Sequence, residues 1–144
     1  MALIRHKKAH LEYEILETLQ AGLELLGTEV KSLRAGRGKL EGARVVVRGG
    51  EAFLVGANIP AWQVVNAPEY DPTRPRRLLL NAKELGHIAA IEGAQGLTIV
   101  PISVYNKGRV LKADIAIVRG KKKHDKRQDI KKRDEDRRLR RKEF

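Results

Sequence analysis

The fold class is decided by residues 44–55, which read Arg44-Val45-Val46-Val47-Arg48-Gly49-Gly50-Glu51-Ala52-Phe53-Leu54-Val55. Two runs rich in β-branched and apolar residues flank a pair of glycines. Glycines adopt the positive φ angles that a two-residue hairpin turn requires. This stretch therefore predicts an antiparallel β-hairpin with its turn at Gly49-Gly50.

Two further segments also indicate strands. In residues 100–105 and 111–117, separated by a turn at 106–108, apolar residues alternate with others, which predicts a second hairpin. Pro101 inside it indicates an edge position or a bulge.

Residues 12–26 are compatible with either a helix or a strand. A helix would hold Gly22 at its middle, at a cost of about 1 kcal/mol. Their alternation favours a long bent strand, with a bulge or sharp bend at Gly22.

Short helices are predicted near 28–35 and 81–92. Thr28 is expected to cap the first, with Glu29 in its first turn, and Asn81 with Glu84 makes a capping box for the second. Residues 57–77 contain four of the five prolines, which predicts a long loop. The chain is expected to be mainly β with peripheral helices. The architecture expected is an OB-like closed antiparallel barrel of about six strands.

The positive charge is concentrated at the C-terminal end. The 144-residue chain has a formal net charge of +12, and residues 119–144 contain 14 basic and 6 acidic side chains. We expect residues 1–119 to form an RNA-binding barrel and residues 120–144 to form a basic tail. Three acid–base pairs four residues apart favour a helix in the tail too weakly to hold it alone, so we expect disorder until a partner binds.

Composition also narrows the function. The chain has no cysteine, no long apolar segment and no signal peptide, which indicates a cytoplasmic protein without membrane contact. The four histidines have no nearby ligand cluster and no catalytic motif is recognisable, so we expect neither metal, cofactor nor enzymatic activity. His6 and His10 are expected to be solvated. With only six aromatic residues, a folded RNA recognised by shape and phosphate contacts is a better partner than a stacked single strand.

Four motifs resemble the small protein B family, the bacterial partner of transfer-messenger RNA. They are GTEVKSLRAG at 27–36, GEAFLVGANI at 50–59, YDPTRPRRLLL at 70–80 and KKKHDKR at 121–127. The resemblance covers residues 5–133. It implies a protein that binds the tRNA-like domain of transfer-messenger RNA and delivers that RNA to stalled 70S ribosomes for trans-translation, the rescue of ribosomes on messages without a stop codon. Elongation factor Tu and alanyl-tRNA synthetase would be partners through the RNA.

The resemblance also implies two sets of site residues. On the barrel, the RNA-binding face would include Gln20, Leu79 and Lys112, with basic support from Lys7, Lys8 and Lys31. The family commonly has Glu at position 20 and Asn at position 6, where this chain has Gln20 and His6. The tail would enter the decoding centre beside 16S rRNA and the empty mRNA channel, with Lys121, Lys122, Lys123, His124, Asp125, Lys126 and Arg127.

For Leu79 the alternative is a core position, and for Lys112 a merely solvated lysine. The alternative function is a ribosomal-protein or initiation-factor-like OB module that binds rRNA. A monomer is expected.

Overall fold

The computed structural model describes residues 2–63, 69–94 and 96–120. Its elements are β1 (Ala2–Arg5), α1 (Ala9–Glu12), β2 (Tyr13–Leu23), α2 (Gly27–Arg34), β3 (Arg44–Arg48), β4 (Glu51–Val55), β5 (Arg76–Leu79), α3 (Ala82–Ile91), β6 (Leu97–Lys107) and β7 (Val110–Gly120). All seven strands belong to one sheet of order β1-β6-β7-β2-β5-β4-β3. Each pair of neighbours is antiparallel. The mainly β fold and both predicted hairpins are confirmed.

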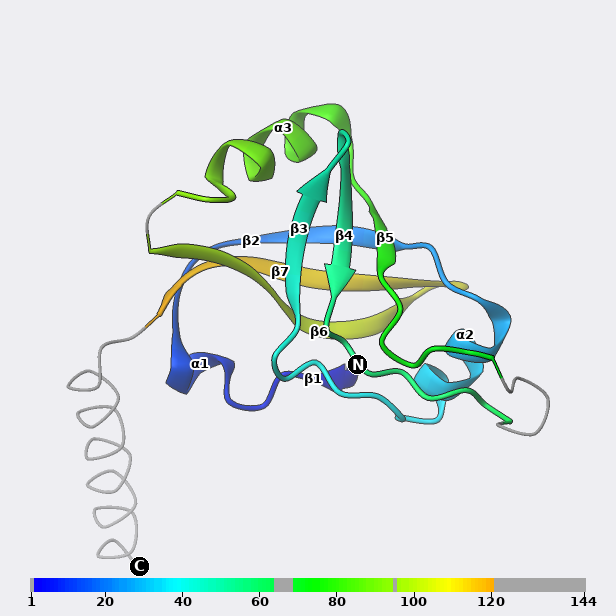
Figure 1. Ribbon diagram of the computed structural model, residues 1–144. Coiled ribbons are helices and arrows are strands. Elements are labelled where there is room, and N and C mark those ends of the chain that lie inside the picture. Colours follow the sequence, from blue (N-terminus) through cyan, green and yellow to red (C-terminus); the bar gives the residue numbers. More distant parts are fainter. Residues whose placement is uncertain (1, 64–68, 95, 121–144) are drawn as a thin grey trace, which may run out of the picture.

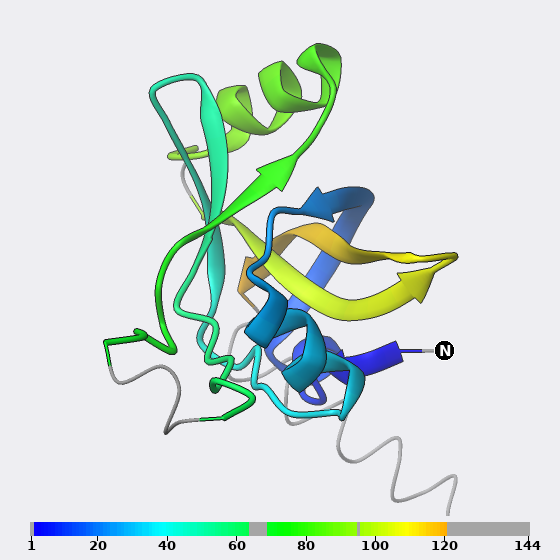
Figure 2. The ribbon, with the colours of Figure 1, turned by 90° about the vertical axis from the view of Figure 1, so that its right-hand side faces the viewer.

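The sheet bends so strongly that its two halves cross. β2, β6 and β7 form one layer, and β3, β4 and β5 pass steeply across it (Figure 1). Inward side chains of both halves fill the core between them, including Val45, Leu54, Leu78, Ile99 and Ile115. Helix α3 lies at one end of this arrangement and α1 and α2 at the other (Figure 1). The view in Figure 2 shows the β6–β7 hairpin extending past α2.

The predicted closed barrel is wrong, because no ladder of hydrogen bonds joins β3 to β6 or β1 in the described part of the chain. β3 approaches β6 without pairing with it. The edge of β6 is partly occupied by β1, whose Arg5 is paired with Ser103. On β3, the Val47 N–H donates to the Glu92 carboxylate at 2.7 Å, so a side chain takes a bond that a closing strand would use. The strand count of about six is one short of the seven described strands, and neither β1 nor β5 was among the segments predicted as strands. β5 begins at Arg76, inside the predicted loop over residues 57–77.

β2 is the long strand expected over residues 12–26, but its bulge is elsewhere. The register shifts between Ile15 and Glu17, not at Gly22. Gly22 is paired with Lys112 of β7 on one side and with Leu79 of β5 on the other. The predicted irregularity at Pro101 is confirmed as a bulge, since the β6–β7 register shifts between Pro101 and Ser103.

Both predicted helices are present, and one of the two predicted caps is confirmed. Asn81 Oδ1 accepts a hydrogen bond from the Glu84 N–H at 2.7 Å, as the capping box requires. In α2 the predicted cap is wrong, because the N-cap residue is Leu26. The Thr28 hydroxyl instead accepts from the Trp62 N–H at 2.6 Å. The Glu29 carboxylate accepts from the Leu26 N–H at 2.7 Å, so an acid in the first turn satisfies the helix terminus.

Candidate nucleic-acid interface

Three of the predicted site residues meet on one face of the sheet. Gly22 is paired with both Leu79 and Lys112, and Lys112 is paired with Tyr105. Gln20, two residues before Gly22, is on the same face of β2 because side chains alternate along a strand. We call this surface the outer face and define it by Gln20, Leu79, Tyr105, Lys107, Lys112 and Asp114. It is built from β2, β5, β6 and β7.

A chain of hydrogen bonds links three strands of the outer face. The Lys107 ammonium donates to Gln20 Oε1 at 3.0 Å, and Gln20 Nε2 donates to the Tyr105 hydroxyl. The Tyr105 hydroxyl donates to Asp114 Oδ1 at 3.1 Å. Burial and the hydrogen bond to Asp114 raise the pKa of Tyr105, although the contact with Gln20 acts in the opposite direction. The phenol therefore remains a protonated donor near neutral pH, and Gln20 is held in one orientation.

Leu79 is a surface residue and not part of the core. Its exposed fraction is 49%, whereas that of the preceding Leu78 is 3%. A large apolar side chain left this open at the middle of a polar face offers van der Waals contact to a partner. Lys112 is half-buried between its neighbours, so its stem is partly packed rather than simply solvated.

The three lysines predicted as basic support are all exposed. Lys7 and Lys8 follow β1, and Lys7 lines a hollow beside the outer face together with Arg5. Lys31 is on α2, where Arg34 donates to the backbone carbonyl of Arg109 in the β6–β7 turn at 3.1 Å. That contact places α2 beside the end of the hairpin that bears Lys107 and Lys112.

A buried carboxylate holds α2 against the loop that leads into β5. Glu29 and Arg76 are both fully buried, and Arg76 Nε donates to Glu29 Oε2 at 2.7 Å. Arg74 Nε donates to the same oxygen at 3.0 Å, and the Tyr70 hydroxyl donates to it at 2.9 Å. Burial alone would raise the pKa of Glu29, but these donors and the Leu26 N–H lower it below its ordinary value. This cluster positions β5, and therefore Leu79.

Sequence reasoning missed several residues of this region. Tyr105 and Asp114 were considered only as members of alternating runs. Alternation along residues 111–117 was the available signal that Asp114 shares a face with Lys112, whereas Tyr105 is placed there by the β6–β7 register. His6, expected to be solvated, is buried with an exposed fraction of 5%. Its ring packs edge-on against Tyr13, with centroids 6.1 Å apart. The predicted tail residues 121–127 lie outside the described residues.

Other kinds of site find no support in the part of the chain that the structure describes. Within residues 2–63, 69–94 and 96–120, no three His, Cys, Asp or Glu side chains gather in a way that could hold a metal ion. None of the described helices is both long and apolar enough to cross a bilayer.

A strongly basic chain with an open antiparallel sheet and a face of lysine, amide, phenol and exposed leucine is a module suited to binding a polyanion. The family model described as SmpB protein matches residues 3–143. The chain belongs to this family.

Individual relatives agree with the family match. The SsrA-binding protein of Thermosipho africanus (strain TCF52B) is 46% identical over 135 residues, which cover 93% of this chain and 91% of the relative. The SsrA-binding protein of Gloeobacter violaceus is 46% identical over 132 residues, covering 92% and 87%. A chain of the solved structure described as "tmRNA-SmpB: a journey to the center of the bacterial ribosome" is 38% identical. It matches with a TM-score of 0.69, over 83% of this chain and 84% of that chain.

Proposed function

We propose that this protein binds the tRNA-like domain of transfer-messenger RNA and delivers that RNA to stalled 70S ribosomes for trans-translation. The observation that carries the proposal is the identity of 46% to a protein named SsrA-binding protein over 93% of this chain. The solved structure whose description names tmRNA, SmpB and the bacterial ribosome supports the same partners. It acts as a cytoplasmic binding protein, not as an enzyme.

Within this function, the outer face is the RNA-binding surface. Gln20 and Lys112 offer hydrogen bonds and charge, and Leu79 offers an apolar contact. Lys7, Lys8 and Lys31 supply positive charge at its border. A rigid face with few aromatic side chains suits a folded RNA that is recognised by its shape and its phosphates.

The tail has a separate task. The residues after Gly120 fold as a helix in the decoding centre and the empty mRNA channel of the ribosome. Lys121, Lys122, Lys123, His124, Asp125, Lys126 and Arg127 lead that segment. A high density of positive charge favours a channel walled by rRNA, and the imidazole of His124 stacks on a base and donates a hydrogen bond.

The test is a titration of the full chain, and of a chain that ends at Gly120, with the tRNA-like domain. An unrelated hairpin of equal length is the control, and two salt concentrations separate recognition from charge. We expect both chains to prefer the tRNA-like domain at the higher salt. The truncated chain should keep most of its RNA affinity and lose rescue of stalled ribosomes. A preference that disappears with the tail, or at the higher salt, would contradict the proposal.

A further inference from the structure

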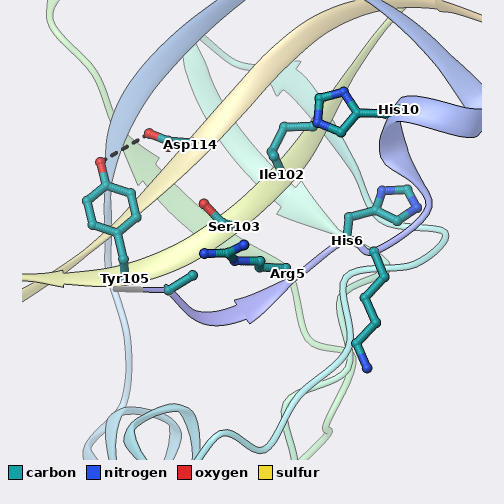
Figure 3. Close-up of a pocket in the computed structure, with 9 residues that line it drawn as sticks. Arg5, His6, His10, Ile102, Ser103, Tyr105 and Asp114 are labelled. Carbon is teal, nitrogen blue, oxygen red and sulfur yellow. Dashed lines mark hydrogen bonds between the residues drawn. The ribbon is translucent and has the colours of Figure 1, made fainter. Parts of the chain in front are cut away.

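The hollow beside the outer face contains an unexplained buried histidine. His6 lines it, together with Arg5, Lys7, Ser103, Tyr105 and Asp114, and its volume is about 580 Å³. We call it the His6 pocket. Pockets of roughly 300–1,000 Å³ are the usual size of small-ligand sites. Figure 3 shows that His6 lies on the side opposite Tyr105 and Asp114, with the Arg5 side chain between the two sides.

His6 is the observation that indicates a ligand. It is buried, and both ring nitrogens are without a hydrogen-bond partner among the described residues. The Glu12 carboxylate is 3.6 Å from Nε2, which is too long for a hydrogen bond. A buried polar group without a partner is unfavourable by about 1–3 kcal/mol, so native structures rarely keep one without a reason. Both nitrogens are also closed off from solvent, so a ligand that turns the ring toward the pocket would give one of them a partner.

The charges of the pocket are arranged in two parts. Arg5 and Lys7 are exposed, and neither forms an ion pair with any residue that the structure describes. Asp114 accepts one hydrogen bond from Tyr105, so its carboxylate keeps further acceptor capacity. The pocket therefore offers two cations without ion pairs and an oriented acceptor beside an aromatic ring.

A nucleotide carries the complementary groups. Its phosphate matches Arg5 and Lys7, and a base with an amino group matches the carboxylate of Asp114, which accepts from such groups in nucleic-acid complexes. Tyr105 belongs to both the pocket and the outer face, so a nucleotide in the pocket is continuous with an RNA on that face. A free phosphate would leave Asp114 unused and facing an anion.

We propose that the His6 pocket receives one unstacked nucleotide of the bound RNA, with its phosphate at Arg5 and Lys7 and its amino-bearing base edge at Asp114. This inference rests on the proposed function, because it takes the ligand to be part of a structured RNA. On binding, His6 turns one ring nitrogen toward the same nucleotide and so gains the hydrogen-bond partner that it lacks. The pocket thus adds recognition of a single base to a face that otherwise reads shape and phosphates.

The experiment uses the full chain and the tRNA-like domain, in which each unpaired nucleotide is replaced in turn by an abasic one. The protein variants are Asp114→Asn, Arg5→Ala and His6→Asn. His87→Ala is the matched control, since His87 is an exposed histidine on α3 that is paired with Glu17 at 2.8 Å and lies outside the pocket. Thermal melting checks that each variant is folded. Asp114→Asn keeps the shape of the residue and tests the proposal even where His6→Asn does not fold.

We expect one abasic position to lower the affinity of the unaltered protein roughly tenfold, which is the usual value of a specific base contact. At that position alone, Asp114→Asn should cause almost no further loss, because both changes remove the same contact. His87→Ala should bind as the unaltered protein does. If the affinity loss from the abasic nucleotide and the loss from Asp114→Asn multiply at every position, the pocket holds no base. That result would overturn the proposal even if the protein still prefers the tRNA-like domain.

A second readout is the NMR signal of the His6 imidazole, assigned with His6→Asn. We expect it to shift on addition of the tRNA-like domain and not with inorganic phosphate alone. Equal shifts with the tRNA-like domain and with inorganic phosphate would overturn the proposal, because they would indicate a simple anion site. An unaltered protein that binds the tRNA-like domain no better than a control hairpin would instead contradict the proposed function itself.

Discussion

Gly22 of β2 and Leu79 of β5 pack so closely that a Cβ at position 22 would lie 3.1 Å from the Leu79 Cβ. The two residues are paired across the strands, and the absence of a side chain at Gly22 gives Leu79 its place on the outer face. The exposed leucine and the buried glycine are therefore one structural feature.

Replacing Gly22 by alanine should displace Leu79 and reduce affinity for the tRNA-like domain severalfold. The change in the free energy of unfolding should stay within about 1 kcal/mol, because alanine also lowers the entropy of the unfolded chain and offsets part of the crowding. Binding titration and urea unfolding measure the two effects. Gly27→Ala is the control, since nothing lies within 4 Å of a Cβ at that position. Equal affinities of the two variants would contradict the role of Leu79.

Replacing Glu29 by glutamine should destabilise the protein by about 3–5 kcal/mol, because it leaves the buried guanidinium of Arg76 without its carboxylate. Urea unfolding monitored by circular dichroism gives the value. Glu51→Gln is the control, as its pair with Arg77 at 3.3 Å is exposed and should contribute less than about 1 kcal/mol. Similar losses in the two variants would show that the Glu29 cluster does not hold α2 and β5 together.

The same carboxylate predicts how stability depends on pH. The pKa of Glu29 is lowered from its ordinary value of 4.5, so its contribution to stability is fully present above that value. It is lost as the pH falls from 4.5 through the lower folded-state pKa. The difference in unfolding free energy between the unaltered protein and Glu29→Gln should therefore shrink below pH 4.5. Other carboxylates, including Asp71, are common to both proteins and cancel. A difference that stays constant down to pH 3 would contradict this reasoning.

Replacing Tyr105 by phenylalanine should lower RNA affinity severalfold with little change in fold. The hydroxyl joins Gln20 to Asp114, so its removal frees both side chains and leaves a partly exposed carboxylate. We expect a loss of stability of about 1 kcal/mol, typical of one hydrogen bond. Tyr13→Phe is the control, because Tyr13 packs edge-on against His6 and takes no part in the hydrogen bonds that join Gln20, Tyr105 and Asp114. An unchanged RNA affinity in Tyr105→Phe would show that this hydrogen-bond network does not contribute to RNA binding.

Local patterns predicted the elements well where the relevant physics is local. The Gly49-Gly50 turn and the Asn81–Glu84 capping box involve residues at most a few positions apart, and both are present. The α2 cap shows the limit of such reasoning. Thr28 has the right chemistry for a cap, but its hydroxyl accepts from Trp62, which is distant in sequence.

The site could be predicted only in part. Gln20, Leu79 and Lys112 came from the family resemblance, and the strand register brings them together. Tyr105 and Asp114 could be assigned to the site only from the strand register and the hydrogen-bond network. His6 was misjudged because a histidine beside two lysines is usually solvated, whereas the fold packs β1 and α1 around it.

By itself, the sequence determined that this is a mainly β chain with two hairpins, two short helices and a strongly basic end. Those features depend on side-chain alternation, turn residues and charge along the chain. Only the tertiary structure decided that the sheet stays open, that Glu29 and Arg76 are buried together and that His6 faces a pocket. Each of these depends on contacts between segments far apart in sequence, because the free energy of burying a charge or pairing an edge is set by the partner that the fold brings to it.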